Sequence, residues 1–136
     1  MSKKKDIVIR LYKSIVRPHI DYCIQAWRPH HASDIVMLER IQKRATRMIE
    51  ECKGMAYTQR LNMCILTTLE TRRLRADLIE VYKIIKGKEG IDKDRLFIMA
   101  ENMENKGTRG HSKKLYRKRV NTDVGKYSFG NRVVSE

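Results

Sequence analysis

The first segment with a regular hydrophobic pattern runs from Asp6 to Val16. Its apolar residues recur about every 3.6 positions, a pattern that predicts a helix with one buried stripe. These residues are Ile7, Val8, Leu11, Tyr12, Ile15 and Val16. Because proline lacks an amide hydrogen and disfavours the α conformation in the residue before it, we expect the helix to end just before Pro18. Proline fits the first turn of a helix, so Pro18 should begin a second one.

The second helix is predicted within RPHIDYCIQAW, from Pro18 to about Trp27, with Pro29 ending it. This stretch holds the chain's one tryptophan. Four of its side chains recur at helical spacing and together would bury a large apolar area: Ile20, Cys23, Ile24 and Trp27. The pattern therefore favours a piece of core over a reactive site.

A longer amphipathic helix is predicted next, with Ser33 or Asp34 as N-cap and Gly54 as the glycine after its end. Its expected apolar face holds Ile35, Leu38, Ile41, Ala45, Met48 and Ile49. Its other side carries cations three or four positions apart, which project together: Arg40, Lys43, Arg44 and Arg47.

A short helix at 58–63 should precede another long one in LTTLETRRLRADLIEVYKIIKG. There Thr67 and Glu70 match a capping box, and Gly87 marks the end. The expected apolar seam consists of Leu74, Leu78, Val81 and Ile85.

The helical rhythm fails after Gly90. From Lys106 to Arg119 there are seven cations and no acid: Lys106, Arg109, Lys113, Lys114, Arg117, Lys118 and Arg119. This run either orders only against phosphate or adds short strands to a missing neighbour. The expected fold class is all-α, a small helical bundle at 1–90 with a basic, mostly irregular C-terminal segment at 91–136.

The net charge of the chain favours some classes of function over others. Lys and Arg outnumber Asp and Glu by 30 to 16, which gives a net charge of +14 and points to a polyanionic partner. Nucleic acid is favoured over an anionic membrane, and the chain has no stretch of about 18 apolar residues that could cross a bilayer. Cys23, Cys52 and Cys64 form an odd set without paired spacing, which is typical of reduced thiols in an intracellular protein, nuclear or cytoplasmic.

Motifs for catalysis or metal binding are weak. His19 and Cys23, followed by His30 and His31, are zinc-type ligands, but structural zinc sites usually use two compact pairs. The sequence holds no glycine-framed nucleophile, no phosphate-binding glycine loop and no neighbouring aspartates for two metal ions. We therefore expect no catalytic residue, no metal site and no cofactor.

Several blocks of the chain resemble a known family. LYKSIVRPHIDYCIQAW, LERIQKRATRMI, LTTLETRRLRADLIEVYKIIKG, TRGHSKKL and NRVV look like the region downstream of the polymerase core in non-LTR, LINE-type (jockey-like) retrotransposon reverse transcriptases. The resemblance implies a helical, thumb-like and connecting region that lies beside the template–primer and helps hold it. It implies nucleic-acid contacts by Arg44, Arg47, Arg72, Arg73, Arg75, Arg109 and His111.

The chain also departs from this family. The fingers and the palm with its paired aspartates are absent, and the family's Trp-Asn segment does not follow Glu136. We therefore expect a non-catalytic nucleic-acid-binding module. It would be either a fragment of a mobile element or a module that a host gene has retained. The alternatives are a module for self-association or for binding a polymerase core, an inactive fragment, and a merely solvated basic face.

Overall fold

The computed structural model describes residues 4–99 and 114–135. The described chain is mostly helical, with a small two-stranded sheet, which confirms the predicted fold class. It divides into two compact units, Met1–Ala76 and Asp77–Glu136. Among the helices that the structure describes, none is both long and apolar enough to span a membrane.

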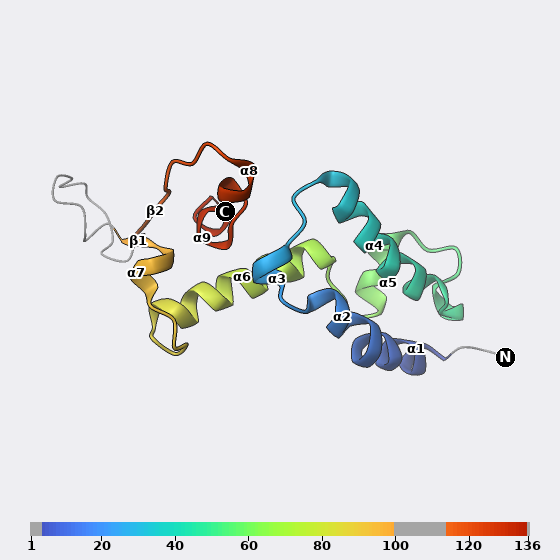
Figure 1. Cartoon of the computed structure of the whole chain (residues 1–136). Helices are drawn as coiled ribbons and strands as arrows, with labels where there is room; N and C mark the ends of the chain where they lie inside the picture. The colour runs from blue at the N-terminus through green and yellow to red at the C-terminus, as the bar shows by residue number, and fades with distance from the viewer. Residues whose placement is uncertain (1–3, 100–113, 136) are drawn as a thin grey trace. The chain divides into compact units, whose positions relative to one another are not determined.

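The helices of the first unit follow one another closely along the chain (Figure 1). They are α1 (Lys5–Leu11), η1 (Tyr12–Val16), α2 (Arg17–Asp21), α3 (Ile24–Trp27), α4 (Ala32–Arg47), η2 (Glu50–Cys52), α5 (Tyr57–Met63) and the first half of α6 (Leu69–Ile85). The second unit holds the rest of α6, then α7 (Lys93–Leu96), β1 (Ile98–Met99), β2 (Leu115–Tyr116), α8 (Asp123–Lys126) and α9 (Phe129–Val133). The two strands pair antiparallel, with Ile98 opposite Tyr116.

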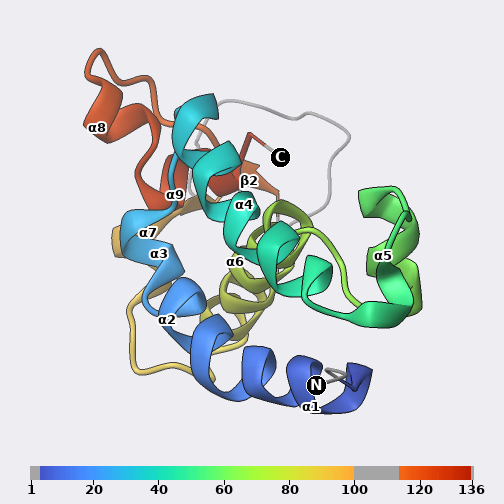
Figure 2. The same cartoon turned by 90° about the vertical axis from the view of Figure 1, so that its right-hand side faces the viewer.

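Pro18 does not separate two helices as predicted. The chain stays helical from α1 through η1 into α2, which Figure 2 shows as one continuous run. Arg17 keeps an α conformation, at φ −60° and ψ −42°, and its amide donates to the Tyr12 carbonyl, five residues back. The π-helical turn at η1 therefore accommodates the proline, whose ring would clash with the carbonyl of an α-helical turn.

The expected core stripe of RPHIDYCIQAW is only half correct. Ile20 and Ile24 are buried, but the helix breaks at Cys23, which is exposed and lies in the left-handed region at φ 50°. Because of this break, Trp27 is 40% exposed rather than buried, and its indole N–H donates to the Tyr22 carbonyl.

The buried face of α4 differs from the predicted one. Gln42 and Thr46 are buried, whereas Ile41 and Met48 are exposed. The helix is also shorter than expected: it starts after His31 and ends at Arg47, and Gly54 lies beyond η2. The polar side chains stay inside because they are hydrogen-bonded, as for Thr46, whose hydroxyl donates to the Lys43 carbonyl at 3.0 Å.

α6 begins one residue later than the predicted capping box implies. The Thr68 hydroxyl, not that of Thr67, accepts the Thr71 amide at 3.2 Å. The predicted end is confirmed: Gly87 has φ +65°, its amide donates to Ile84, and the Lys88 amide donates to Lys83. These two bonds form a Schellman motif, which needs a left-handed residue after the helix.

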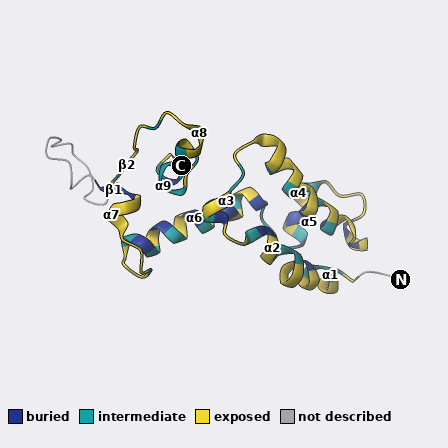
Figure 3. Cartoon of the chain, in the orientation of Figure 1, coloured by how far each residue is buried: buried dark blue, intermediate teal, exposed yellow. Residues whose placement is uncertain are grey.

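Along α6 the buried positions again include charged residues (Figure 3). Leu78, expected in the apolar seam, is 47% exposed. The buried residues recur every three or four positions and are Leu69, Arg73, Asp77, Val81 and Ile84. The predicted seam is correct at Val81 and wrong at Leu78, because hydrophobicity alone ranked Leu78 above Asp77.

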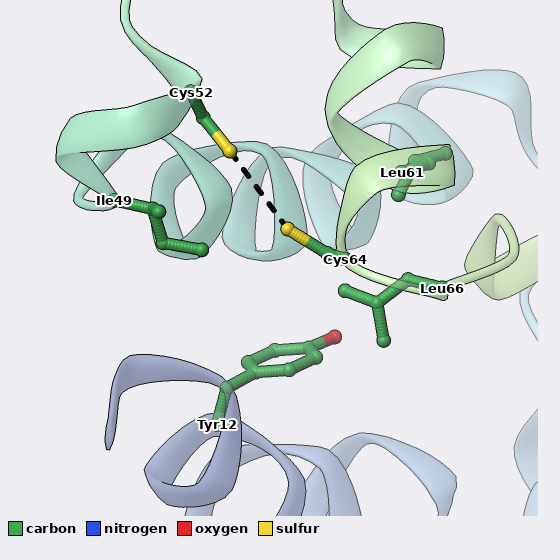
Figure 4. Packing of buried hydrophobic residues seen from close by; sticks show 6 residues of the cluster. All are labelled: Tyr12, Ile49, Cys52, Leu61, Cys64 and Leu66. Atoms are coloured by element: carbon green, nitrogen blue, oxygen red, sulfur yellow. Dashed lines mark hydrogen bonds between the residues drawn. The ribbon is translucent and has the colours of Figure 1, made fainter. Parts of the chain in front are cut away.

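The core of the first unit combines apolar side chains with a polar centre. Its buried cluster consists of Tyr12, Ile49, Cys52, Leu61, Cys64 and Leu66 (Figure 4). Beside it, the Tyr12 hydroxyl donates to the Gln42 side chain at 2.7 Å. The Gln42 amide donates to the Tyr57 hydroxyl at 3.0 Å and to the Thr67 carbonyl at 2.9 Å. Gln42 thus ties three segments together.

The second unit has its own core of Val81, Ile84, Phe97 and Val133. Because this cluster takes two residues from α6, the compact units divide at 76/77 rather than at the predicted 90/91. A buried ion pair supports it: Arg132 contacts both carboxylate oxygens of Asp77, at 3.0 and 3.1 Å. Helix α9 is therefore packed into the core of this unit.

Candidate nucleic-acid interface

Four cations of α4 line a surface hollow of about 540 Å³. They are Arg40, Lys43, Arg44 and Arg47, the four that the sequence placed on the basic face. The three arginines are exposed, and Lys43 is partly buried. The helix spacing of three and four residues gathers these side chains on one side of the helix.

Glu39, which precedes Arg40 on α4, is hydrogen-bonded to residues of α5 and α6. The Glu39 carboxylate accepts a hydrogen bond from the Tyr57 hydroxyl and another from the Leu69 amide, at 3.0 Å. Leu69 is the first residue of α6, so the carboxylate also lies at the positive end of that helix. Among the residues that the structure describes, the lining of the hollow holds these cations and no acid.

Tyr57 also contacts the basic face. The Lys43 ammonium lies 5.1 Å from the centre of the Tyr57 ring, a cation–π distance. Burial and the hydrogen bond to Glu39 raise the pKa of the Tyr57 hydroxyl well above its ordinary value of 10.0. The ring therefore stays neutral and donates its proton inward while it supports Lys43 from one side.

The four cations repel one another because they share one hollow. Within residues 4–99 and 114–135, the structure records no ion pair of theirs with an acid. Arg44 and Arg47 gain some stabilisation from the negative C-terminal end of α4, whose last turn they occupy. A bound polyanion would relieve the remaining repulsion, which is what a phosphate-binding surface requires.

The predicted arginines of α6 occupy three different environments. Arg75 is exposed, and Arg72 forms an ion pair with Asp21. Arg73 is 2% exposed. The prediction that Arg73 contacts a phosphate is wrong for this structure, because its side chain is not at the surface.

Arg73 instead belongs to the interior of the first unit. Its guanidinium lies 5.9 Å from the Trp27 ring centre. Burial lowers the pKa of Arg73, and the nearby charges of Asp21 and Glu39 act in the opposite direction. Its Nε and Nη2 atoms have no hydrogen-bond partner among the described residues, so this cation is held by packing and by neighbouring charge.

The cations of the C-terminal run are only partly described. Lys114, Arg117, Lys118 and Arg119 are exposed beside and after β2. The remaining predicted contacts, Arg109, His111 and Lys113, lie outside the described residues, as does Lys106. A second hollow, of about 410 Å³, has Arg95, Lys118 and Asp94 in its lining. Its mixed charge makes it a weaker anion site than the hollow of α4.

The histidine and cysteine residues that the sequence analysis considered as zinc ligands do not form a metal site among the described residues. Within the described part of the chain, no group of three or more His, Cys, Asp or Glu side chains is placed to hold a metal ion. His30 and His31 stack on each other, with ring centres 4.1 Å apart, and Cys23 is exposed.

Sequence reasoning missed the residues that hold this surface in place. Gln42 and Thr46, four positions apart on α4, were the available signal, because two uncharged polar residues at that spacing share one face of a helix. The inward turn of Glu39 had no comparable signal, since its partners Tyr57 and Leu69 lie 18 and 30 residues away.

Comparisons of the chain with protein-family models, with curated proteins and with solved structures found no match. The fold and the surface therefore define a small, mostly helical protein with a cationic hollow. The resemblance to retrotransposon reverse transcriptases stays an interpretation of the sequence blocks.

Proposed function

We propose that this chain is a non-catalytic nucleic-acid-binding module that grips backbone phosphates through α4. The observation that carries this proposal is the hollow lined by Arg40, Lys43, Arg44 and Arg47, with no acid among the described residues of its lining. Arginine and lysine are the side chains that bind phosphate oxygens, and such contacts do not read base sequence. The module should therefore tolerate many sequences.

The net charge of +14 supports the same proposal, because long-range attraction brings a polyanion to the surface. Three exposed cations could contact further phosphates of the nucleic acid: Arg117, Lys118 and Arg119. The resemblance to the region beside a reverse-transcriptase core suggests a template–primer or a related RNA or DNA as the ligand.

The test is fluorescence anisotropy with labelled single-stranded RNA, single-stranded DNA and duplex DNA at several salt concentrations. The logarithm of affinity should fall with the logarithm of salt, with a slope of about −0.9 per neutralised phosphate on duplex and about −0.7 on single strands. Replacing Arg40, Arg44 and Arg47 by glutamine should weaken binding and flatten the slope by up to about 2.7 on duplex.

A matched control removes the same charge elsewhere. Lys4, Arg10 and Lys13 are exposed at or near α1, and changing all three to glutamine also takes the net charge from +14 to +11. If both triple variants lose the same affinity, only net charge matters and the α4 surface is not the site. If the unchanged chain binds no nucleic acid at low salt, the proposal fails.

Self-association is a second candidate, favoured by an exposed apolar stripe. Ile7, Leu11 and Ile15 lie four positions apart along α1 and η1 and are all more than half exposed. Side chains at this spacing share a helix face, and exposed apolar faces often mark protein contacts. Sedimentation at rising concentration should then show a dimer that Leu11→Glu dissociates. A strict monomer at all concentrations contradicts this candidate.

A further inference from the structure

Three sulfur atoms meet in the core of the first unit. Cys52 ends η2, while Met63 and Cys64 lie at the end of α5. The Cys52 sulfur is 3.9 Å from the Cys64 sulfur and 3.8 Å from the Met63 sulfur. Figure 4 shows the two cysteine side chains pointing toward each other across the cluster. Both cysteines are buried, and Met63 is partly buried.

These distances match those between ligands of one metal ion. Metal–sulfur bonds in thiolate sites are about 2.3 Å long, so sulfurs arranged around one ion at tetrahedral or trigonal angles lie about 3.8 to 4.0 Å apart. The Cys52–Met63 and Cys52–Cys64 distances fall in this range. Two of the three sulfur–sulfur distances therefore already fit a shared metal ion.

The ligand set selects the metal. Two thiolates and a thioether are soft ligands, which favour Cu(I), whereas a structural zinc site is almost always closed by four ligands. The described residues offer no group of three or more His, Cys, Asp or Glu side chains that would complete a zinc site. We propose that Cys52, Met63 and Cys64 bind one Cu(I) ion.

Charge at the cluster is compatible with this. Binding breaks the two S–H bonds and releases both protons to solvent, so one Cu(I) with two thiolates carries a net charge of −1. Burial raises the pKa of the Cys64 thiol, while the nearby charges of Lys5 and Arg60 act in the opposite direction. Arg60 is itself buried, and its Nε has no hydrogen-bond partner within the described residues. These cations would balance the anionic complex.

The test is an anaerobic titration of the reduced, full-length chain with Cu(I) against a chromophoric Cu(I) chelator. The chain should take one Cu(I) from the chelator and develop ultraviolet thiolate-to-copper absorption. Met63→Leu keeps an apolar side chain of similar size and should lower Cu(I) affinity at least about tenfold. Cys52→Ala and Cys64→Ala should each abolish the tight site.

Cys23→Ser provides the matched control, because Cys23 is exposed and lies outside the cluster. It should leave Cu(I) affinity unchanged. Circular dichroism of Met63→Leu checks that its fold is intact, so a loss of affinity there cannot be ascribed to unfolding. The proposal is overturned if the chain takes no Cu(I) from the chelator, or if folded Met63→Leu binds as tightly as the unchanged chain.

Discussion

The two long helices, α4 and α6, both carry several arginines, and the structure uses them differently. On α4, Arg40, Arg44 and Arg47 surround an open hollow. On α6, Arg72 is paired with Asp21 and Arg73 is buried. The positions of nearby acids explain much of the difference. The Glu39 carboxylate of α4 is hydrogen-bonded to Tyr57 and to the Leu69 amide, whereas the Asp21 carboxylate of α2 pairs with Arg72 of α6. A run of arginines in a sequence therefore does not by itself identify a binding surface.

Of the changes considered for the two helices, loss of the buried ion pair between Asp77 of α6 and Arg132 should have the largest effect. Arg132→Ala leaves the Asp77 carboxylate, which is fully buried, without its arginine, and should cost about 3 to 5 kcal/mol of unfolding free energy. Urea denaturation measures the loss. Arg75→Ala, at an exposed α6 position, should change stability by less than about 0.5 kcal/mol.

A double variant separates the ion pair from simple packing. Asp77→Asn combined with Arg132→Met removes both charges while keeping side-chain volume. It should be more stable than Arg132→Ala alone, because no unpaired charge stays buried. Equal losses in the two variants would mean that the pair's charges contribute little.

On α4, the corresponding folding contact is polar but uncharged. Gln42→Leu leaves the Tyr12 hydroxyl and the Thr67 carbonyl without the partner that each has now, and should cost about 2 to 3 kcal/mol. Urea denaturation again provides the measurement. Ile41→Gln, on the exposed side of α4, should lower the free energy of unfolding much less. A larger decrease would mean that Ile41 belongs to the buried face, as hydrophobicity predicted.

The ends of the two helices differ as well. α6 ends in a left-handed glycine, Gly87 at φ +65°, whereas α4 ends at Arg47 and Met48 in right-handed conformations. Gly87→Ala should cost about 1 kcal/mol, because a Cβ is disfavoured in the left-handed region. Met48→Ala should leave the end of α4 intact, as followed by thermal unfolding. If Gly87→Ala is neutral, the Schellman motif does not stabilise α6.

A pH effect is expected from Tyr57, which supports α4. Its pKa is raised above 10.0 by burial and by the bond to Glu39, so the unfolded chain loses the phenolic proton first as pH rises. Its contribution is fully present below pH 10 and is lost progressively above it. Unfolding free energies measured from pH 8 upward should fall less steeply in Tyr57→Phe. If the unfolding free energy falls equally steeply with pH in both chains, the raised pKa of Tyr57 does not contribute to stability.

The sequence predicted the helices better than it predicted their faces. Hydrophobic spacing located α4 and α6 and the glycine end of α6 because these features depend on neighbouring residues. It placed Ile41, Met48 and Leu78 inside and left Gln42 and Asp77 out. Those polar residues are buried because distant partners satisfy them, and no local pattern shows the partners.

The candidate surface on α4 was predictable in part for the same reason. The four cations of α4 follow from helical spacing, and the structure brings all of them to one hollow. Arg73 is buried and lies 5.9 Å from the ring centre of Trp27, a residue far from it along the chain, so its burial has no local signal. The approach of Cys52 to Cys64 depends on the intervening turn and α5, so spacing along the chain did not reveal it.

The most direct test of the central claim compares the salt dependence of nucleic-acid binding in two variants. One changes Arg40, Arg44 and Arg47 of α4 to glutamine, and the other changes Arg72 and Arg75 of α6 to glutamine. We expect the α4 variant to flatten the slope for duplex DNA by up to about 2.7, and the α6 variant to flatten it by much less per charge removed. An α4 variant with the slope of the unchanged chain would contradict the account.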